Sequence, residues 1–120
     1  MRFLWVALAG AAGAVTRYAI GLGFGPQRFP WATLLINISG SLLLAFVVTV
    51  ATEHHLPADL STAVAVGFLG AYTTYSTFTW ETFVMGKGDD PGLASLYVFC
   101  SLAGGVAAAW IGYTLARALR

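Results

Sequence analysis

The chain has 120 residues, of which 58% are hydrophobic and 9% are charged, with six Lys or Arg residues against five Asp or Glu residues. This composition excludes an ordinary soluble domain and indicates a membrane protein in a lipid bilayer. The sequence has no basic patch for nucleic acid, no cluster of metal-ligand residues and no pairing of a nucleophile with a base. We therefore predict neither an enzyme nor a nucleic-acid-binding protein.

Four apolar stretches are long enough to cross a bilayer, which takes about 20 helical residues. We place these spans at residues 3–24, 31–52, 60–85 and 93–118. The connections between them are short and rich in Pro, Gly and charged residues, as expected where helices end in water. The first span continues past Arg17 to Phe24, which favours a retained span over a cleaved signal peptide. The prediction is an all-α membrane protein with one four-span domain over residues 1–120.

Basic residues normally accumulate on the cytoplasmic side of a membrane protein. Here the side with both termini has Arg2, Arg117 and Arg120, and the opposite side has Arg28 and Lys87, or three residues if Arg17 is counted. Such a weak bias predicts insertion in both orientations, and hence an antiparallel homodimer with a two-fold axis in the membrane plane. The alternative is that a short chain simply has few charges.

The third span contains the most unusual sequence, GFLGAYTTYSTFTWE at residues 67–81, with five consecutive hydroxyl-bearing residues at 72–76. Polar sequence at membrane depth is expected only where protein surrounds it or water reaches it. Gly70 together with Thr73 and Thr74 predicts a helix broken near its middle, with free carbonyl groups that could hold a cation. Function should be concentrated in this segment.

Two charged residues lie inside predicted spans, and each has two interpretations. Arg17 is either an interfacial anchor whose side chain reaches the headgroups or a cation that draws anions into a water-filled vestibule. Glu81 is either a boundary residue or part of a polar path. His54 and His55 fall in a connection, where solvation explains them. No Asp, Glu or Lys lies at central depth, which disfavours a proton-coupled carrier.

Neutral hydrogen-bond donors are found instead at central depth. Asn37, Ser39 and Ser41 lie on the second span, and Tyr97 and Ser101 lie on the fourth. Amide and hydroxyl groups can replace the water around an anion without holding it by a fixed charge. These donors indicate a polar path for an anion.

Aromatic rings in the third span allow two interpretations. Tyr75 and Phe78 are three residues apart and so share a helix face, where their electropositive ring edges could line that path or simply form core.

Small residues four apart predict close helix packing in two spans. They are Ala9 and Gly13 in the first span and Gly104, Ala108 and Gly112 in the fourth. Cys100 is the single cysteine of the chain, so it cannot form an internal disulfide, and we interpret it as an apolar core residue.

Three sequence blocks resemble the Fluc (CrcB) family of fluoride channels, and the similarity extends over all four spans. The blocks are GAAGAVTRY at residues 10–18, TLLINISGS at 33–41 and the segment at 67–81. The resemblance implies a passive, fluoride-selective channel of the inner membrane that exports fluoride and confers fluoride resistance. It also implies an antiparallel, dual-topology homodimer with two pores and a structural sodium ion at the dimer axis.

The resemblance further assigns roles to individual positions. Asn37 would donate a hydrogen bond to fluoride, and Tyr75 and Phe78 would present their ring edges to it. The polar side of the pore would comprise Ser76, Thr77, Glu81, Tyr97 and Ser101. Arg17 and Thr33 would belong to the vestibule, and the backbone carbonyls of Gly70 and Thr73 from both subunits would bind the sodium ion. The chain departs from the family in having Tyr75 in place of a phenylalanine and Ala71 in place of a second glycine.

Two other classes of protein remain as alternatives. Small multidrug exporters share the length, the four spans and the dual topology, but they depend on a glutamate in the first span, and this first span has none. A non-transporting subunit of a membrane assembly would require a stable heteromeric partner.

Overall fold

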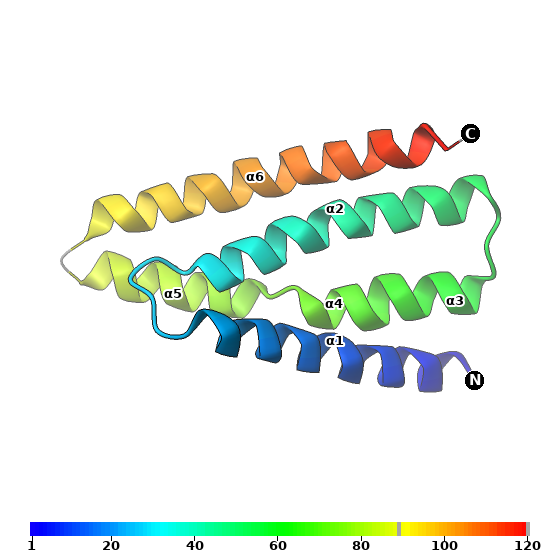
Figure 1. Cartoon of the computed structure of the whole chain (residues 1–120), viewed down its shortest axis with the longest axis horizontal. Helices are drawn as coiled ribbons and strands as arrows, with labels where there is room; N and C mark the ends of the chain where they lie inside the picture. The colour runs from blue at the N-terminus through cyan, green and yellow to red at the C-terminus, as the bar shows by residue number, and fades with distance from the viewer. Residues whose placement is uncertain (89, 120) are drawn as a thin grey trace.

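Four rods of helix make up the computed structural model, which describes residues 1–88 and 90–119 (Figure 1). Three of the rods are single helices, α1 (Arg2–Phe24), α2 (Trp31–Glu53) and α6 (Pro91–Arg117). The third rod is divided into α3 (Ala58–Thr62), the π-helix η1 (Ala63–Leu69), α4 (Gly70–Tyr72) and α5 (Tyr75–Lys87). These bounds lie close to the predicted spans. Asp89 and Arg120, which belong to the predicted connection and charge pattern, lie outside the described residues.

Among the described residues, α1, α2 and α6 are long and apolar enough to cross a membrane. They contain 23, 23 and 27 residues. At about 1.5 Å of rise per residue, each covers the roughly 30 Å hydrocarbon core. No piece of the third rod reaches that length alone, because the rod is interrupted.

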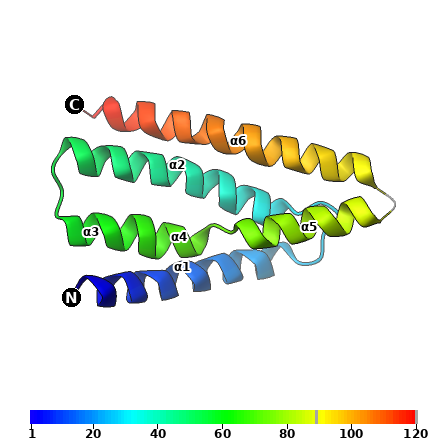
Figure 2. The same ribbon diagram turned by 180° about the vertical axis from the view of Figure 1, so that it is seen from behind.

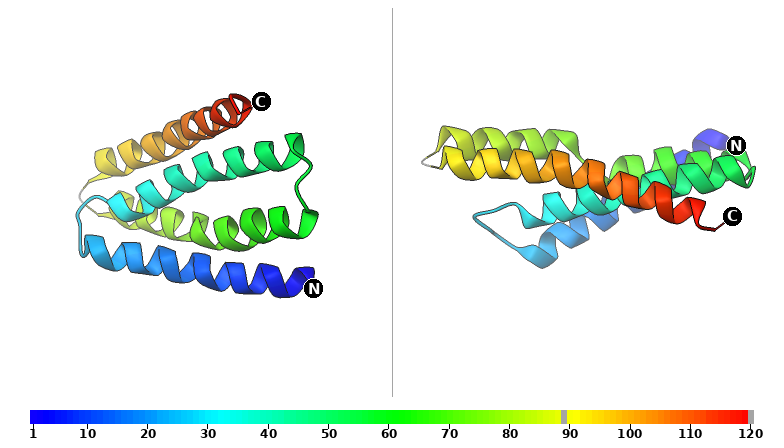
Figure 3. Two further views of the ribbon diagram at one scale, coloured as in Figure 1. Left: turned by 45° about the vertical axis from the view of Figure 1, so that its right-hand side comes forward. Right: turned by 90° about the horizontal axis from the view of Figure 1, so that it is seen from above.

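The rods lie side by side, with both termini at the same end of the molecule (Figures 1 and 2). Helix α2 packs mainly against α6, α1 packs against η1 and α4, and α5 packs against α6. The molecule measures 50 × 30 × 20 Å, so its thinnest dimension is about two helix diameters (Figure 3). Large apolar side chains such as Tyr18, Phe99 and Trp110 are exposed on its faces. Exposed apolar area of this extent must be covered by lipid or by a partner.

The predicted break in the third rod is confirmed at two of its three predicted residues, Thr73 and Thr74. Helix α4 ends at Tyr72, and Thr73 (φ −78°, ψ 159°) and Thr74 (φ −149°, ψ 116°) are extended before α5 begins at Tyr75. Gly70, which we predicted to be part of the break, is helical with φ −63° and ψ −36°. Glycine flexibility is therefore not what interrupts the helix. The interruption begins where the Thr73 hydroxyl and amide both bond to the Leu69 carbonyl, at 2.9 and 3.1 Å.

The end of α4 leaves backbone acceptors without helical partners, as the last carbonyls of any helix do. Within the described part of the chain, no hydrogen bond reaches the carbonyl oxygens of residues 70–73. Ala71 has no special backbone requirement, because His55 is the only described non-glycine residue with a positive φ. The alanine at this position therefore fits the structure without strain.

Small residues permit two close contacts between helices, as predicted. Gly13 of α1 lies so close to η1 that an added Cβ would overlap the Phe68 carbonyl oxygen. Gly112 of α6 lies equally close to the Leu42 carbonyl oxygen of α2. Ala108, one turn before Gly112, is also buried. The close approach of backbones thus fixes how α1 meets η1 and how α2 meets α6.

Candidate functional site

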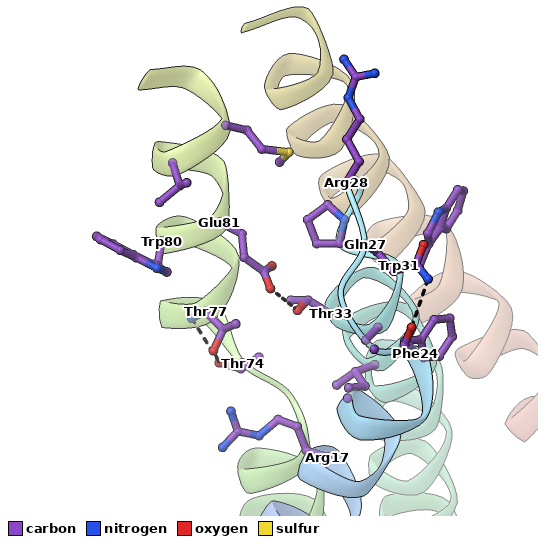
Figure 4. A pocket seen from close by; sticks show the side chains of 17 residues that line it. Arg17, Phe24, Gln27, Arg28, Trp31, Thr33, Thr74, Thr77, Trp80 and Glu81 are labelled. Carbon is purple, nitrogen blue, oxygen red and sulfur yellow. Dashed lines mark hydrogen bonds between the residues drawn. The ribbon is translucent and has the colours of Figure 1, made fainter. Parts of the chain in front are cut away.

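A cavity of about 490 Å³ opens between α1, α2 and α5 near the connection from α1 to α2. Its lining includes Arg17, Thr33, Thr77 and Glu81, which the sequence predicted as vestibule or pore residues (Figure 4). Residues from that connection, among them Gln27 and Arg28, also line it. The structure thus brings together side chains from three rods that are distant in the sequence.

Glu81 is the acidic group of this cavity and is tied to two neighbouring rods. Thr33 of α2 donates a hydrogen bond to Glu81 Oε1 at 2.8 Å. Tyr97 of α6 donates to Oε2 at 2.7 Å. Thr33 is 6% exposed and Tyr97 is fully buried, so these hydroxyls hold the carboxylate in place from below the cavity surface. Charge-assisted bonds of this kind are about twice as strong as neutral ones.

Arg17 approaches the same cavity from α1, and Figure 4 shows its guanidinium directed away from its own helix. Its Nε atom is buried and has no hydrogen-bond partner in the described part of the chain. No ion pair joins Arg17 to Glu81 among the described residues, whereas Arg2 and Arg28 are each paired with an aspartate. A partly buried cation without a protein partner is an attractive site for an anion.

A second, smaller cavity of about 270 Å³ lies at the helix break. Asn37 and Ser41 of α2, Tyr75 and Phe78 of α5 and Ser101 of α6 line it, together with Thr73 and Thr74. The Oγ atom of Ser101 is buried and has no hydrogen-bond partner within the described ranges. A donor left free in this way can bind a guest without breaking an existing bond.

The two aromatic side chains of the smaller cavity differ sharply in exposure. Tyr75 is 78% exposed, whereas Phe78 is 9% exposed, although their ring centroids are 6.1 Å apart. Phe78 also meets Tyr97 in an edge-to-face contact at 5.2 Å. The interpretation of the pair as ordinary core therefore fails for Tyr75, because most of its side chain is exposed in a single copy.

Asn37 is already engaged in this structure. Its Oδ1 accepts a hydrogen bond from the Thr74 amide at 2.8 Å, and its Nδ2 donates to the Thr74 carbonyl at 3.0 Å. A carboxamide nitrogen carries two hydrogens, so one N–H remains for a ligand. The role of a fluoride donor, which the resemblance gave to Asn37, is compatible with this geometry.

Three predicted residues line neither cavity. Tyr97 is fully buried and donates its hydrogen bond to Glu81. Ser76 is exposed on the first turn of α5, beside Tyr75, and Gly70 is exposed on α4. Thr73, the other predicted sodium ligand, lines the smaller cavity. The structure therefore brings most of the predicted pore set together and leaves Ser76 and Gly70 on the surface of a single copy.

Thr74 was noticed in the sequence only as part of the break, yet it has the densest set of contacts there. Its side chain caps α5 by accepting from the Thr77 amide at 3.3 Å and donates to the Thr77 hydroxyl at 3.0 Å. Threonine is one of the residues preferred at the N-cap of a helix. The sequence did not single out Thr74 as the N-cap, because it lies in a run of five hydroxyl-bearing residues.

Comparison with known proteins gives a family for this site. The model of the family described as CrcB-like protein, Camphor Resistance (CrcB), matches residues 4–113. The chain belongs to the CrcB family. The match includes all the predicted site residues and both cavities.

Curated relatives cover nearly the whole chain. A protein of Bacillus cereus named fluoride-specific ion channel FluC 1 is 44% identical over 94% of this chain and 85% of its own length. A protein of Acidobacterium capsulatum named fluoride-specific ion channel FluC is 43% identical over 93% of each chain. A protein of the same name from Thermus thermophilus is 40% identical over 98% of this chain and 95% of its own length. The CrcB protein described here is a membrane protein with relatives that are named as ion channels.

Proposed function

We propose that this CrcB protein is a passive channel that conducts fluoride across the membrane. The observation that carries the proposal is the smaller cavity at membrane depth, where the free Ser101 hydroxyl, the remaining N–H of Asn37 and the Tyr75–Phe78 pair converge. Relatives at 40–44% identity named as fluoride-specific channels support the same ion.

The chemistry of the two cavities suits a small, strongly hydrated anion. The positive charge of Arg17 in the larger cavity would attract the anion. The neutral donors and aromatic ring edges of the smaller cavity would then bind it. Binding by neutral donors is weak enough for the ion to leave again, which conduction requires. Among the described residues, no Asp, Glu, Lys or Arg lines the smaller cavity, so no fixed charge traps or repels the ion there.

The functional unit we propose is an antiparallel homodimer with two pores. The exposed ring of Tyr75 and the thin, slab-like shape of one copy support a second copy covering the smaller cavity. Exposed Ser76 would then face the pore between the copies. The nearly even distribution of basic residues supports insertion in both orientations, into the inner membrane of the cell.

A structural sodium ion at the dimer axis is part of the same proposal. The carbonyl oxygens of Gly70 and Thr73 have no hydrogen-bond partner among the described residues, and carbonyl oxygens are ligands that hard cations prefer. Two copies would supply two such pairs. The ion would neutralise the negative ends of the two α4 helices where they meet.

The decisive experiment is fluoride efflux from liposomes that contain the purified full-length protein. We expect rapid fluoride efflux that follows the fluoride gradient and needs no proton gradient, with chloride efflux at the level of protein-free liposomes. Chloride efflux as fast as fluoride efflux would refute selectivity, and the absence of any anion flux would refute a channel. Proton-driven efflux of a lipophilic cation would instead assign the small multidrug exporter class, which family membership does not support.

A further inference from the structure

The backbone of Thr74 crosses the helix break in an extended conformation and is paired with the side chain of Asn37. The amide and the carbonyl of Thr74 each form one hydrogen bond with the Asn37 carboxamide, at 2.8 and 3.0 Å. A carboxamide presents the same donor and acceptor as a peptide group, so Asn37 acts toward Thr74 as a neighbouring backbone segment would. The pair satisfies both polar groups of a residue that is 9% exposed at membrane depth.

The side chain of Thr74 connects this pair to α5. It accepts from the Thr77 amide at 3.3 Å and donates to Thr77 Oγ1 at 3.0 Å. The first turn of α5, which contains Tyr75 and Phe78, is therefore anchored to α2 through Thr74. A shift of Thr74 would move both rings of the smaller cavity.

Thr74 is also the only described residue that lines both cavities. The larger cavity also contains Arg17 and Glu81, and the smaller cavity also contains Asn37, Phe78 and Ser101. The Asn37–Thr74 pair therefore lies at the boundary that the two cavities share.

We propose that Thr74, held by Asn37, is a positioning residue of the ion path at the boundary that the two cavities share. This inference rests on the proposed function and adds a role for a residue outside the predicted pore set. The Thr74 side chain has no hydrogen left for the ion, because its hydroxyl donates to Thr77. It acts through the placement of Asn37, Tyr75 and Phe78.

The test compares the unitary fluoride current of three variants in planar bilayers. The current through one open pore does not depend on how many molecules have folded, so a merely structural defect does not change it. Thr74→Val keeps the shape of the side chain but removes the cap, and Thr74→Ser keeps the hydroxyl. Thr82→Val is the matched control, since the Thr82 hydroxyl donates to the Phe78 carbonyl of its own helix and Thr82 lines a separate groove.

We expect Thr74→Val to lower the unitary current about fivefold or more, which corresponds to a rise of about 1 kcal/mol in the barrier to conduction. Thr74→Ser should restore most of the current, and Thr82→Val should conduct like the wild type. An unchanged unitary current in Thr74→Val would overturn the role of Thr74. A wild-type protein without fluoride current would instead refute the proposed function.

A backbone substitution provides the second measurement if Thr74→Val does not fold. Replacing Thr74 by the corresponding α-hydroxy acid removes the amide hydrogen that Asn37 Oδ1 accepts and retains the side chain. The same substitution at Thr82 is its control. We expect a reduced unitary current only at position 74, and equal currents at the two positions would overturn the proposal.

Discussion

Tyr97 of α6 donates a hydrogen bond of 2.7 Å to Glu81 of α5 from a position with no solvent exposure. This bond joins the two helices at the base of the larger cavity. Thr33 holds the other carboxylate oxygen, so the orientation of Glu81 is determined by both neighbours. The contact therefore joins the packing of α5 and α6 to the lining of the larger cavity.

Tyr97→Phe should lower the free energy of unfolding by about 1–3 kcal/mol, because Glu81 Oε2 loses its donor in a buried setting. The measurement is thermal unfolding of the purified protein in detergent. Tyr113→Phe is the matched control on the same helix, since the Tyr113 hydroxyl accepts from Arg117 at a site that is 37% exposed. Equal stability of the two variants would contradict a structural role for the Tyr97–Glu81 bond.

Gly13→Ala should destabilise the protein by about 1–3 kcal/mol, because the new methyl group would force α1 away from the Phe68 carbonyl. Gly23→Ala in the same helix has no atom within 4 Å of the added methyl, so it should be neutral or stabilising. Thermal unfolding of both variants under one condition tests this difference. A Gly13→Ala protein as stable as Gly23→Ala would show that the α1–η1 contact can relax.

Asn37→Asp should reduce fluoride efflux by about a hundredfold or more while leaving the protein folded. A carboxylate about 4 Å from a passing anion repels it by about 4 kcal/mol at an effective dielectric constant near 20. The ionised side chain also cannot donate to the Thr74 carbonyl. Efflux is measured from liposomes, and size-exclusion chromatography reports folding. Wild-type efflux in Asn37→Asp would remove Asn37 from the ion path.

Phe78→Ile should reduce fluoride efflux about tenfold, because the smaller cavity loses a ring edge and the edge-to-face contact with Tyr97. Phe83→Ile is the control on the same helix, since Phe83 is 58% exposed and lines neither cavity. Both proteins are assayed at the same protein-to-lipid ratio. If Phe83→Ile reduces efflux as much as Phe78→Ile, the ring at 78 has no special role.

If the proposed sodium-bound homodimer exists, purification with sodium replaced by N-methylglucamine should dissociate or inactivate it, because unpaired carbonyls at residues 70–73 would then meet at the proposed two-fold axis without a cation. Return of sodium should restore fluoride efflux. The oligomeric state is followed by light scattering and the function by liposome efflux. A dimer that stays intact and active without sodium would assign the break another purpose.

Much of this architecture is readable in the sequence because the membrane imposes strict requirements. A span needs about 20 apolar residues, and polar groups at membrane depth need partners, so the four rods and the unusual third one follow from composition. The patterns of small residues that contain Gly13 and Gly112 correctly predicted close contacts between helices, because small residues allow two backbones to approach each other.

The point within residues 70–74 at which the helix breaks required the tertiary structure. The sequence placed Gly70, Thr73 and Thr74 together in the break, but the helix continues through Gly70. The chain leaves the helix at Thr73 and Thr74, where Asn37 supplies the hydrogen bonds that the helix no longer provides. A partner 37 residues away in sequence cannot be inferred from local propensity.

The sequence by itself determined the membrane environment, the four rods and the residue types that can accompany an anion, because hydropathy and donor chemistry are local properties. Only the tertiary structure decided which of these residues share a cavity. In the folded chain, Glu81 accepts hydrogen bonds from Thr33 and Tyr97. Tyr75 remains exposed, and Thr74 lines both cavities. Such groupings depend on how four helices pack, and packing is set by contacts between distant parts of the chain.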